Sequence, residues 1–175
     1  MDKRTEGRGP KAEPQGPGLD RSFQDQGATS VCFGCGPEND QGLQIKSHWD
    51  GADAVGTWTA SAQHCGGAKN VVNGGVIATL IDCHGLNLAI ASAYKAEARP
   101  IGTAPRVFFV TANMNIDYRR PTPLGKPLDL RASLVKQEGR KTFVHCSVSF
   151  DGEVCAEAEI LAIRIHRDES VEPTR

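Results

Sequence analysis

Hydrophobic positions along the chain are spaced as in one helix and several strands. The longest apolar segment runs from Val76 to about Ala98, just before Pro100, and is apolar around nearly its whole circumference. This length and pattern predict one buried helix. Shorter strand-like runs lie on either side of it, separated by turn-forming residues. These runs are Leu43 to Trp49, Val55 to Ala60, Val107 to Tyr118, Leu128 to Gln137, Thr142 to Phe150 and Val154 to His166.

The order of the elements is therefore two strands, one helix and four strands. It predicts an α+β fold in which an antiparallel sheet curls around the single helix, because such a sheet supplies the apolar surface that the helix needs. A doubly wound α/β fold is excluded, since only one crossover helix is visible. Asp151-Gly152, between the last two runs, is typical of a two-residue hairpin turn.

The strand after the helix is expected to have two different faces. Its apolar set, which includes Ala112, Met114, Ile116 and Tyr118, alternates with polar neighbours such as Thr111. One face should therefore be buried, while the polar face meets water, a ligand or a partner chain.

Both ends of the chain are polar. Residues 1–27 contain ten charged residues, five Gly and three Pro, so they offer little apolar surface to offset the entropy of ordering. We expect residues 1–30 to form a disordered N-terminal tail, residues 31–166 the folded domain, and residues 167–175 a disordered C-terminal tail.

The overall composition excludes several functional classes. The 20 Lys and Arg residues are balanced by 21 Asp and Glu, so general nucleic-acid binding is disfavoured. No apolar run reaches the roughly 18–20 residues of a membrane span, and the first 20 residues lack the apolar core of a secretory signal. A cytoplasmic location is expected, where the six cysteines should be reduced thiols.

Asn73-Gly74-Gly75 stands at the start of the predicted helix. The free backbone N–H groups of a helix's first turn favour negative charge, including a developing oxyanion. The alternative is a structural one, in which Asn73 caps the helix and the glycines allow a tight entry.

Asp82 lies within the most apolar stretch, where an unpaired carboxylate would be costly to bury. It is either hydrogen-bonded by Thr79 or nearby backbone, or it serves as a nucleophile or general base. Gly74 and Asp82 are eight positions apart, which is about 12 Å along a helix. The two can act on one carbonyl only if two subunits pair with antiparallel helices, which predicts a two-fold dimer with shared sites.

Cys32 and Cys35 suggest a metal or redox pair, but no second CxxC motif exists to complete a four-ligand zinc site. His64-Cys65 or Cys83-His84 could supply the missing ligands. We favour a glycine-rich turn and expect no metal or other cofactor; His84 is interpreted as a packed or interface histidine.

Several motifs, in order between Cys32 and about His166, resemble the PaaI-like acyl-CoA thioesterases of the hotdog-fold superfamily. The Gly-Gly-to-Asp segment is the most specific of them. The matching pieces are Cys32 to Asn39 followed by Gly42-Leu43, Asn73 to Asp82, Asn115 to Pro121, and Gly139-Arg140.

This resemblance implies hydrolysis of an acyl-CoA thioester by a homodimer or a dimer of dimers. The Gly74 N–H would stabilise the oxyanion, and Asp82 of the other subunit would attack or activate water. Thr111 would position that water, and Asn73 would lie beside the substrate carbonyl. The remaining substrate-binding positions would be Gly75, Arg119, Arg120 and Arg140, with Arg119 and Arg120 at the nucleotide end of CoA.

Two positions depart from the family pattern. Many members have His where this chain has Asn73, and several have Asn or Gln where it has Gly67. Both changes touch the binding of the substrate carbonyl, so one alternative is a non-catalytic acyl-CoA or lipid-binding protein on the same fold. Two further alternatives are a zinc-dependent regulatory module and a hotdog dehydratase. The dehydratase is disfavoured because it would use a catalytic His at the helix entry.

Overall fold

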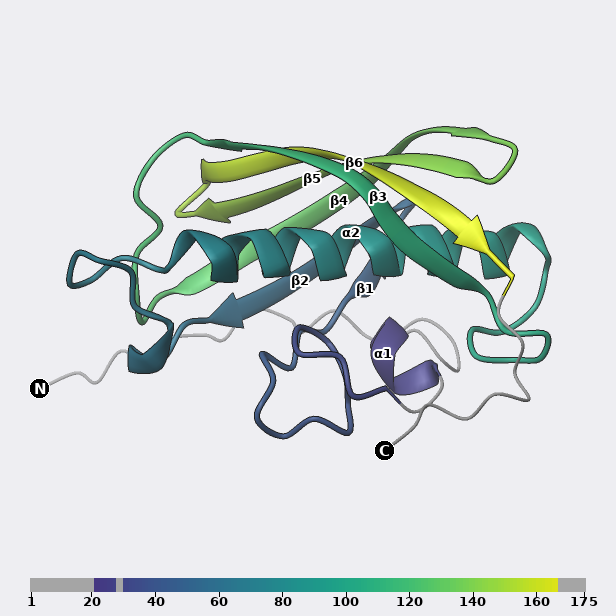
Figure 1. The fold of residues 1–175 in the computed structure, drawn as a ribbon, viewed down its shortest axis with the longest axis horizontal. Coiled ribbons are helices and arrows are strands. Elements are labelled where there is room, and N and C mark those ends of the chain that lie inside the picture. Colours follow the sequence, from purple (N-terminus) through teal and green to yellow (C-terminus); the bar gives the residue numbers. More distant parts are fainter. Residues whose placement is uncertain (1–20, 28–29, 167–175) are drawn as a thin grey trace, which may run out of the picture.

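The computed structural model describes residues 21–27 and 30–166, and it is built around one long helix, α2, Gly74–Ala96 (Figure 1). Six antiparallel strands form one sheet in the order β1-β2-β4-β5-β6-β3. They are β1 His48–Asp50, β2 Asp53–Thr59, β3 Phe108–Tyr118, β4 Pro127–Glu138, β5 Lys141–Phe150 and β6 Glu153–Ile165. The predicted α+β architecture, with a curled sheet around one helix, is confirmed.

The helix starts and ends where local chemistry dictates. Asn73 caps its first turn, so α2 begins at Gly74, two residues before the apolar run. At the other end Ala98 has a positive φ of 52°, which is incompatible with helix continuation, and Pro100 follows. The observed end at Ala96 is therefore close to the predicted one.

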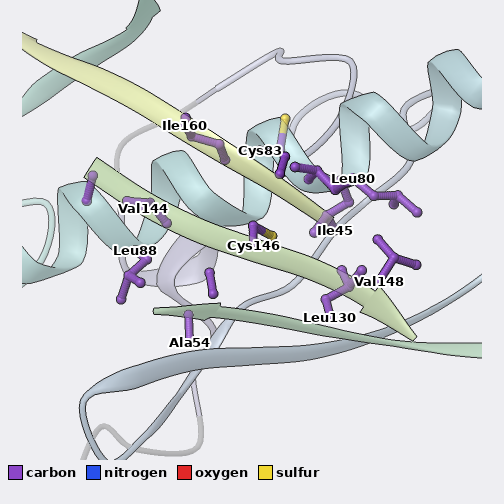
Figure 2. Close-up of a cluster of buried hydrophobic side chains, with 14 of the residues drawn as sticks. Ile45, Ala54, Leu80, Cys83, Leu88, Leu130, Val144, Cys146, Val148 and Ile160 are labelled. Atoms are coloured by element: carbon purple, nitrogen blue, oxygen red, sulfur yellow. The ribbon is translucent and has the colours of Figure 1, made fainter. Parts of the chain in front are cut away.

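The sheet covers one side of α2, and the fully buried side chains of Leu80, Ile81 and Leu88 are part of the resulting core. Gly85 lets α2 pack closely against β6, because a Cβ there would lie 2.5 Å from Ile160 Cδ1. In Figure 2, Leu88 lies beside β5 and the neighbouring Ala54. By length and hydropathy alone α2 would qualify as a membrane span, which the sequence analysis did not anticipate, but over half of its most apolar window is buried inside this domain.

His84 is completely buried on α2. Its Nδ1 lies 2.8 Å from Ser47 Oγ and its Nε2 lies 3.1 Å from the carbonyl oxygen of Ala54. Burial lowers the pKa of the imidazole to about 4. It is a neutral, packed histidine that links α2 to β2 and the segment before β1.

The two-residue turn predicted at Asp151-Gly152 joins β5 to β6. Asp151 and Gly152 both have positive φ values, 53° and 76°, as a type I′ turn requires. This turn sets the register that carries β6 back along β5.

The first predicted hairpin is shorter than expected, because β1 contains only His48–Asp50. The residues before β1 form backbone hydrogen bonds to the cysteine-containing loop instead of to β2. The N–H of Leu43 donates to the carbonyl of Phe33, and the N–H of Ile45 donates to the carbonyl of Gly34. Part of the predicted strand thus holds the cysteine-containing loop in place.

The predicted disordered N-terminal tail is wrong for residues 21–27, which include a short helix, α1, Phe23–Gln26. Phe23 is buried, and its ring centroid lies 4.8 Å from that of Trp49. Gln24 and Ser47 exchange two hydrogen bonds, of 2.9 and 3.1 Å. Figure 1 shows α1 on the side of α2 opposite the β3–β6 layer. Residues 1–20 and 167–175 lie outside the described residues.

Candidate active site

The N-terminus of α2 combines the two roles that the sequence left open, a structural cap and a free N–H donor for an oxyanion. Asn73 Oδ1 accepts hydrogen bonds from the N–H groups of Gly75 at 2.8 Å and Val76 at 3.4 Å, so Asn73 is the helix cap. The cap leaves the N–H of Gly74 without a hydrogen-bond partner among residues 21–27 and 30–166. Gly74 therefore remains available as a donor, whereas the N–H of Gly75, predicted to contact substrate, is engaged.

Two contacts from outside α2 hold its N-terminus, and sequence reasoning missed both. The Tyr118 hydroxyl, at the end of β3, donates to the carbonyl oxygen of Gly74 at 2.9 Å. The N–H of Asn73 donates to the carbonyl oxygen of His64 at 2.9 Å. Tyr118 is 44 residues from Gly74, so no local pattern could have revealed the pair.

Asp82 lies half-buried on α2, two turns beyond the cap. Its partner is Thr111 of β3, whose hydroxyl lies 2.5 Å from Asp82 Oδ1. Thr79, the partner considered from the sequence, instead donates to the carbonyl oxygen of Gly75 at 2.9 Å. The structure thus brings Asp82 and Thr111 together, and within the described part of the chain Asp82 Oδ2 has no hydrogen-bond partner, so it can meet a substrate or a water.

A β-bulge shapes the strand beside Asp82. Pairing of β3 with β6 shifts register between Thr111 and Asn113, which leaves Ala112 out of the ladder. Bulges of this kind re-aim neighbouring side chains. The bulge also explains why Ala112 is exposed, although the alternation predicted it on the buried face, where Met114 and Ile116 do pack against the core.

Gly74 and Asp82 remain about two helical turns apart in one chain, roughly 12 Å at the standard rise. The helix over Gly74–Ala96 is continuous, so no kink brings them closer. The backbone donor and the acid of one chain cannot meet at one carbonyl carbon.

Asp82 lies in the wall of a cavity of about 330 Å³ between α2, the N-terminal segment and the start of β3. Most of the exposed lining is apolar, and Leu86, Ile90 and Tyr94 continue along the same side of α2 as Asp82. This volume falls within the range of roughly 300–1,000 Å³ that is typical of small-molecule sites. The cavity can accept an apolar group whose polar end lies at Asp82.

Three cysteines from two distant segments meet in the same wall. The sulfurs of Cys32, Cys35 and Cys83 all lie within 4.8 Å of one another. Hydrogen bonding from the Cys83 thiol, the largest cause, lowers the pKa of Cys35 to about 6, while that contact and burial raise the pKa of Cys83. The sequence analysis had named Cys83 as one possible addition to the Cys32 and Cys35 pair, and the structure selects it over Cys65.

The predicted cationic positions do not form one cluster. Arg119 pairs with Glu157 and Arg120 pairs with Glu153, both near the β5–β6 turn. Arg140 follows β4, at the opposite end of β6, where its carbonyl accepts from the N–H of Arg164. Arg119 and Arg120 lie beside Cys155 and Arg140 lies beside Arg164, nine residues farther along β6 or roughly 30 Å, so one chain does not bring Arg140 to Arg119 and Arg120.

Comparison with known proteins agrees with this architecture. Residues 69–157 match the family model of the thioesterase superfamily. Acyl-coenzyme A thioesterase THEM4 of Rattus norvegicus is 34% identical over 105 residues, which cover 60% of this chain and 40% of that protein. The aligned part of the chain spans about 40% of the length of this protein and of its Mus musculus counterpart.

Solved structures share the fold. A thioesterase superfamily protein from Shewanella loihica PV-4 is 35% identical, with a TM-score of 0.57 over 70% of this chain and 91% of that one. The PaaI protein of E. coli, from the phenylacetic acid degradation operon, is 21% identical with a TM-score of 0.58 over 71% of this chain and 81% of that one, and shows the fold alone. The sheet curled around α2 is thus the hotdog fold, and the chain belongs to the thioesterase superfamily.

Proposed function

We propose that this protein hydrolyses the thioester bond of an acyl-CoA, with Asp82 as the general base. The observation that carries the proposal is the contact of Asp82 with Thr111 at the wall of an apolar cavity. The relatives named acyl-coenzyme A thioesterase support the substrate class.

The reaction uses the first residue of one α2 helix, Gly74, and an acid two turns into the α2 helix of the partner, Asp82. The Thr111 hydroxyl donates to Asp82 Oδ1 and holds the carboxylate, while Oδ2 accepts a proton from the attacking water. The water oxygen bonds to the thioester carbon, and the carbonyl oxygen becomes an oxyanion that the Gly74 N–H stabilises. Collapse breaks the carbon–sulfur bond, and the CoA sulfur receives the proton from Asp82. The products are a free acid and CoA.

Because Gly74 and Asp82 of one chain are too far apart, the proposal includes a homodimer in which each site takes Asp82 from one subunit and Gly74 from the other. The free edge of β3 suits such pairing, since Val110 and Tyr118 are exposed there. A dimer of dimers would preserve the same pairs of sites.

The acyl group would lie in the apolar cavity beyond Asp82, against Leu86 and Ile90. Arg119 and Arg120 are proposed to bind the phosphates of CoA. Both are exposed and paired with carboxylates, and exposed ion pairs are weak enough to be exchanged for a phosphate.

The direct test is thiol release from a panel of short, long and aromatic acyl-CoAs. Asp82→Asn should remain folded and lose about 10²-fold or more in turnover, the scale of a lost general base. Asp129→Asn, an exposed acid on β4, is the matched control and should turn over like the parent. Near-parental turnover by Asp82→Asn would remove Asp82 from the mechanism. Tight acyl-CoA binding without turnover by the parent would instead favour a binding protein.

Mixed dimers test the shared site. Gly74→Pro removes the oxyanion donor at the first helical position, where proline is tolerated. Each homodimer of Asp82→Asn or Gly74→Pro should be inactive, while a mixed dimer restores one intact site and recovers activity. Absence of recovery in demonstrably mixed, folded dimers would contradict the shared-site model.

A further inference from the structure

The cysteine cluster lies beside the candidate catalytic acid but has no part in the reaction proposed for it. Cys32 and Cys83 are 51 residues apart in sequence, yet their sulfurs lie 3.7 Å apart, and Cys35 Sγ is within 4.8 Å of both. Four thiolates around zinc at Zn–S distances of about 2.3 Å would have sulfurs roughly 3.8 Å apart. The Cys32–Cys83 separation already matches that edge of a tetrahedron.

The backbone is shaped for this approach. A Cβ at Gly34 would lie 2.3 Å from Cys83 Sγ and 2.8 Å from Thr79 Cγ2, so only glycine lets the loop come this close to α2. The N–H of Gly36 donates to the carbonyl of Cys32 at 2.9 Å and closes the turn that carries both loop cysteines. The arrangement therefore does not depend on side-chain rotamers alone.

The surroundings suit metal-bound thiolates. Asn87 lies one turn beyond Cys83, and its side-chain N–H groups donate to Cys35 Sγ at 3.4 Å and to the carbonyl oxygen of Cys83 at 2.7 Å. Such outer hydrogen bonds orient metal ligands. Cys32 is exposed, which provides a path for an ion, and Figure 2 shows the sulfur of Cys83 directed away from the labelled aliphatic side chains of the core.

We propose that Cys32, Cys35 and Cys83 bind one zinc ion. Three thiolates form a soft, compact ligand set that zinc accepts, and the fourth position is left to a water molecule. The three thiols release their protons to solvent as the ion binds. The ion would tie the loop that carries Cys32 and Cys35 to α2 at the cavity wall. This inference is independent of the proposed thioester hydrolysis.

The test uses the full-length protein, reduced and then stripped of metal with a chelator. Titration with Zn²⁺ against a chromophoric competitor should give one ion per chain, and Co²⁺ should produce the charge-transfer absorption of a thiolate site. Cys32→Ser, Cys35→Ser and Cys83→Ser should each weaken binding at least about 10-fold. Cys65→Ser is the matched control, since Cys65 lies outside the cluster, and it should bind like the parent.

Cys32→Ser keeps the test decisive if the buried Cys83→Ser variant fails to fold, because Cys32 is exposed. Circular dichroism establishes folding of each variant. Absence of a thiolate spectrum from the reduced, folded parent would overturn the proposal. A Cys32→Ser, Cys35→Ser double variant that binds zinc as tightly as the parent would also overturn the proposal. Failure of the reduced parent to bind metal, with loss of two titratable thiols after air oxidation, would assign a redox pair instead.

Discussion

The two sides of α2 are built differently. The side toward the sheet carries Leu88 and Gly85, which are buried against β5, β6 and their neighbours. The side toward the N-terminal segment carries Asp82, Asn87 and Ile90, which are only half-buried and line the cavity. The first side stabilises the fold by excluding water completely, while the second retains polar groups at a surface that a ligand can reach.

The largest effect should come from the side facing the sheet. Leu88→Ala removes a fully buried side chain and is expected to lower the free energy of unfolding by about 3 kcal/mol, the scale of core Leu→Ala changes. Turnover per folded molecule should stay close to parental, because Leu88 does not line the cavity. Urea unfolding and thiol release measure the two quantities.

Ile90→Ala is the counterpart on the cavity side. It should cost less stability, because Ile90 is half-buried, and it should change the preference among acyl chains. Equal losses of stability from Leu88→Ala and Ile90→Ala would contradict the division between the two sides.

The N-terminal segment should give an intermediate effect. Deleting residues 1–27 removes Phe23 from its contact with Trp49 and should cost about 2 kcal/mol, the transfer free energy of one buried Phe. It also removes part of the cavity wall. Deleting residues 1–20 is the matched control and should leave the thermal midpoint unchanged, since those residues are polar and rich in Gly and Pro. A deletion of residues 1–27 as stable as the full chain would show that α1 contributes nothing.

The smallest effect should come from the helix cap. Asn73→Ala should cost roughly 1 kcal/mol, because the N–H groups of Gly75 and Val76 lose their acceptor. Turnover should also fall, since the Gly74 donor depends on an ordered first turn. Asn73→His should retain activity and add a pH dependence near the histidine pKa, because a protonated imidazole can donate to the substrate carbonyl. Unchanged stability and turnover in Asn73→Ala would leave Asn73 without either role.

Local patterns predicted most of the fold. The apolar run of α2, the four long strands after it and the Asp151-Gly152 turn are all properties of adjacent residues, and each was found within a few positions of its predicted place. The elements that differed from the prediction, α1 and β1, are both short. A single Phe in a polar segment signals no helix by itself, and its burial depends on Trp49 and Ser47, which lie more than 20 residues away.

In the candidate site too, features of adjacent residues were predicted and contacts between distant residues were not. Asp82 stood out because a carboxylate is expensive in an apolar helix, and Asn73 and Gly74 stood out because they begin that helix. Thr111 entered through the family resemblance alone, and its contact with Asp82 appeared only in the structure. Tyr118 was predicted on the buried face of its strand, but it is exposed and its hydroxyl contacts Gly74. The register of β6 separated Arg140 from Arg119 and Arg120.

The sequence by itself determined that one long buried helix would carry an acid and a glycine entry within an antiparallel sheet. Hydrophobic period, capping residues and turn residues act between near neighbours, so they can be recognised along the chain. Only the tertiary structure decided that α1 closes one side of the cavity and that Cys83 meets Cys32 and Cys35. Those contacts join residues about 25 to 50 positions apart, and packing of the whole domain, rather than any local preference, brings them together.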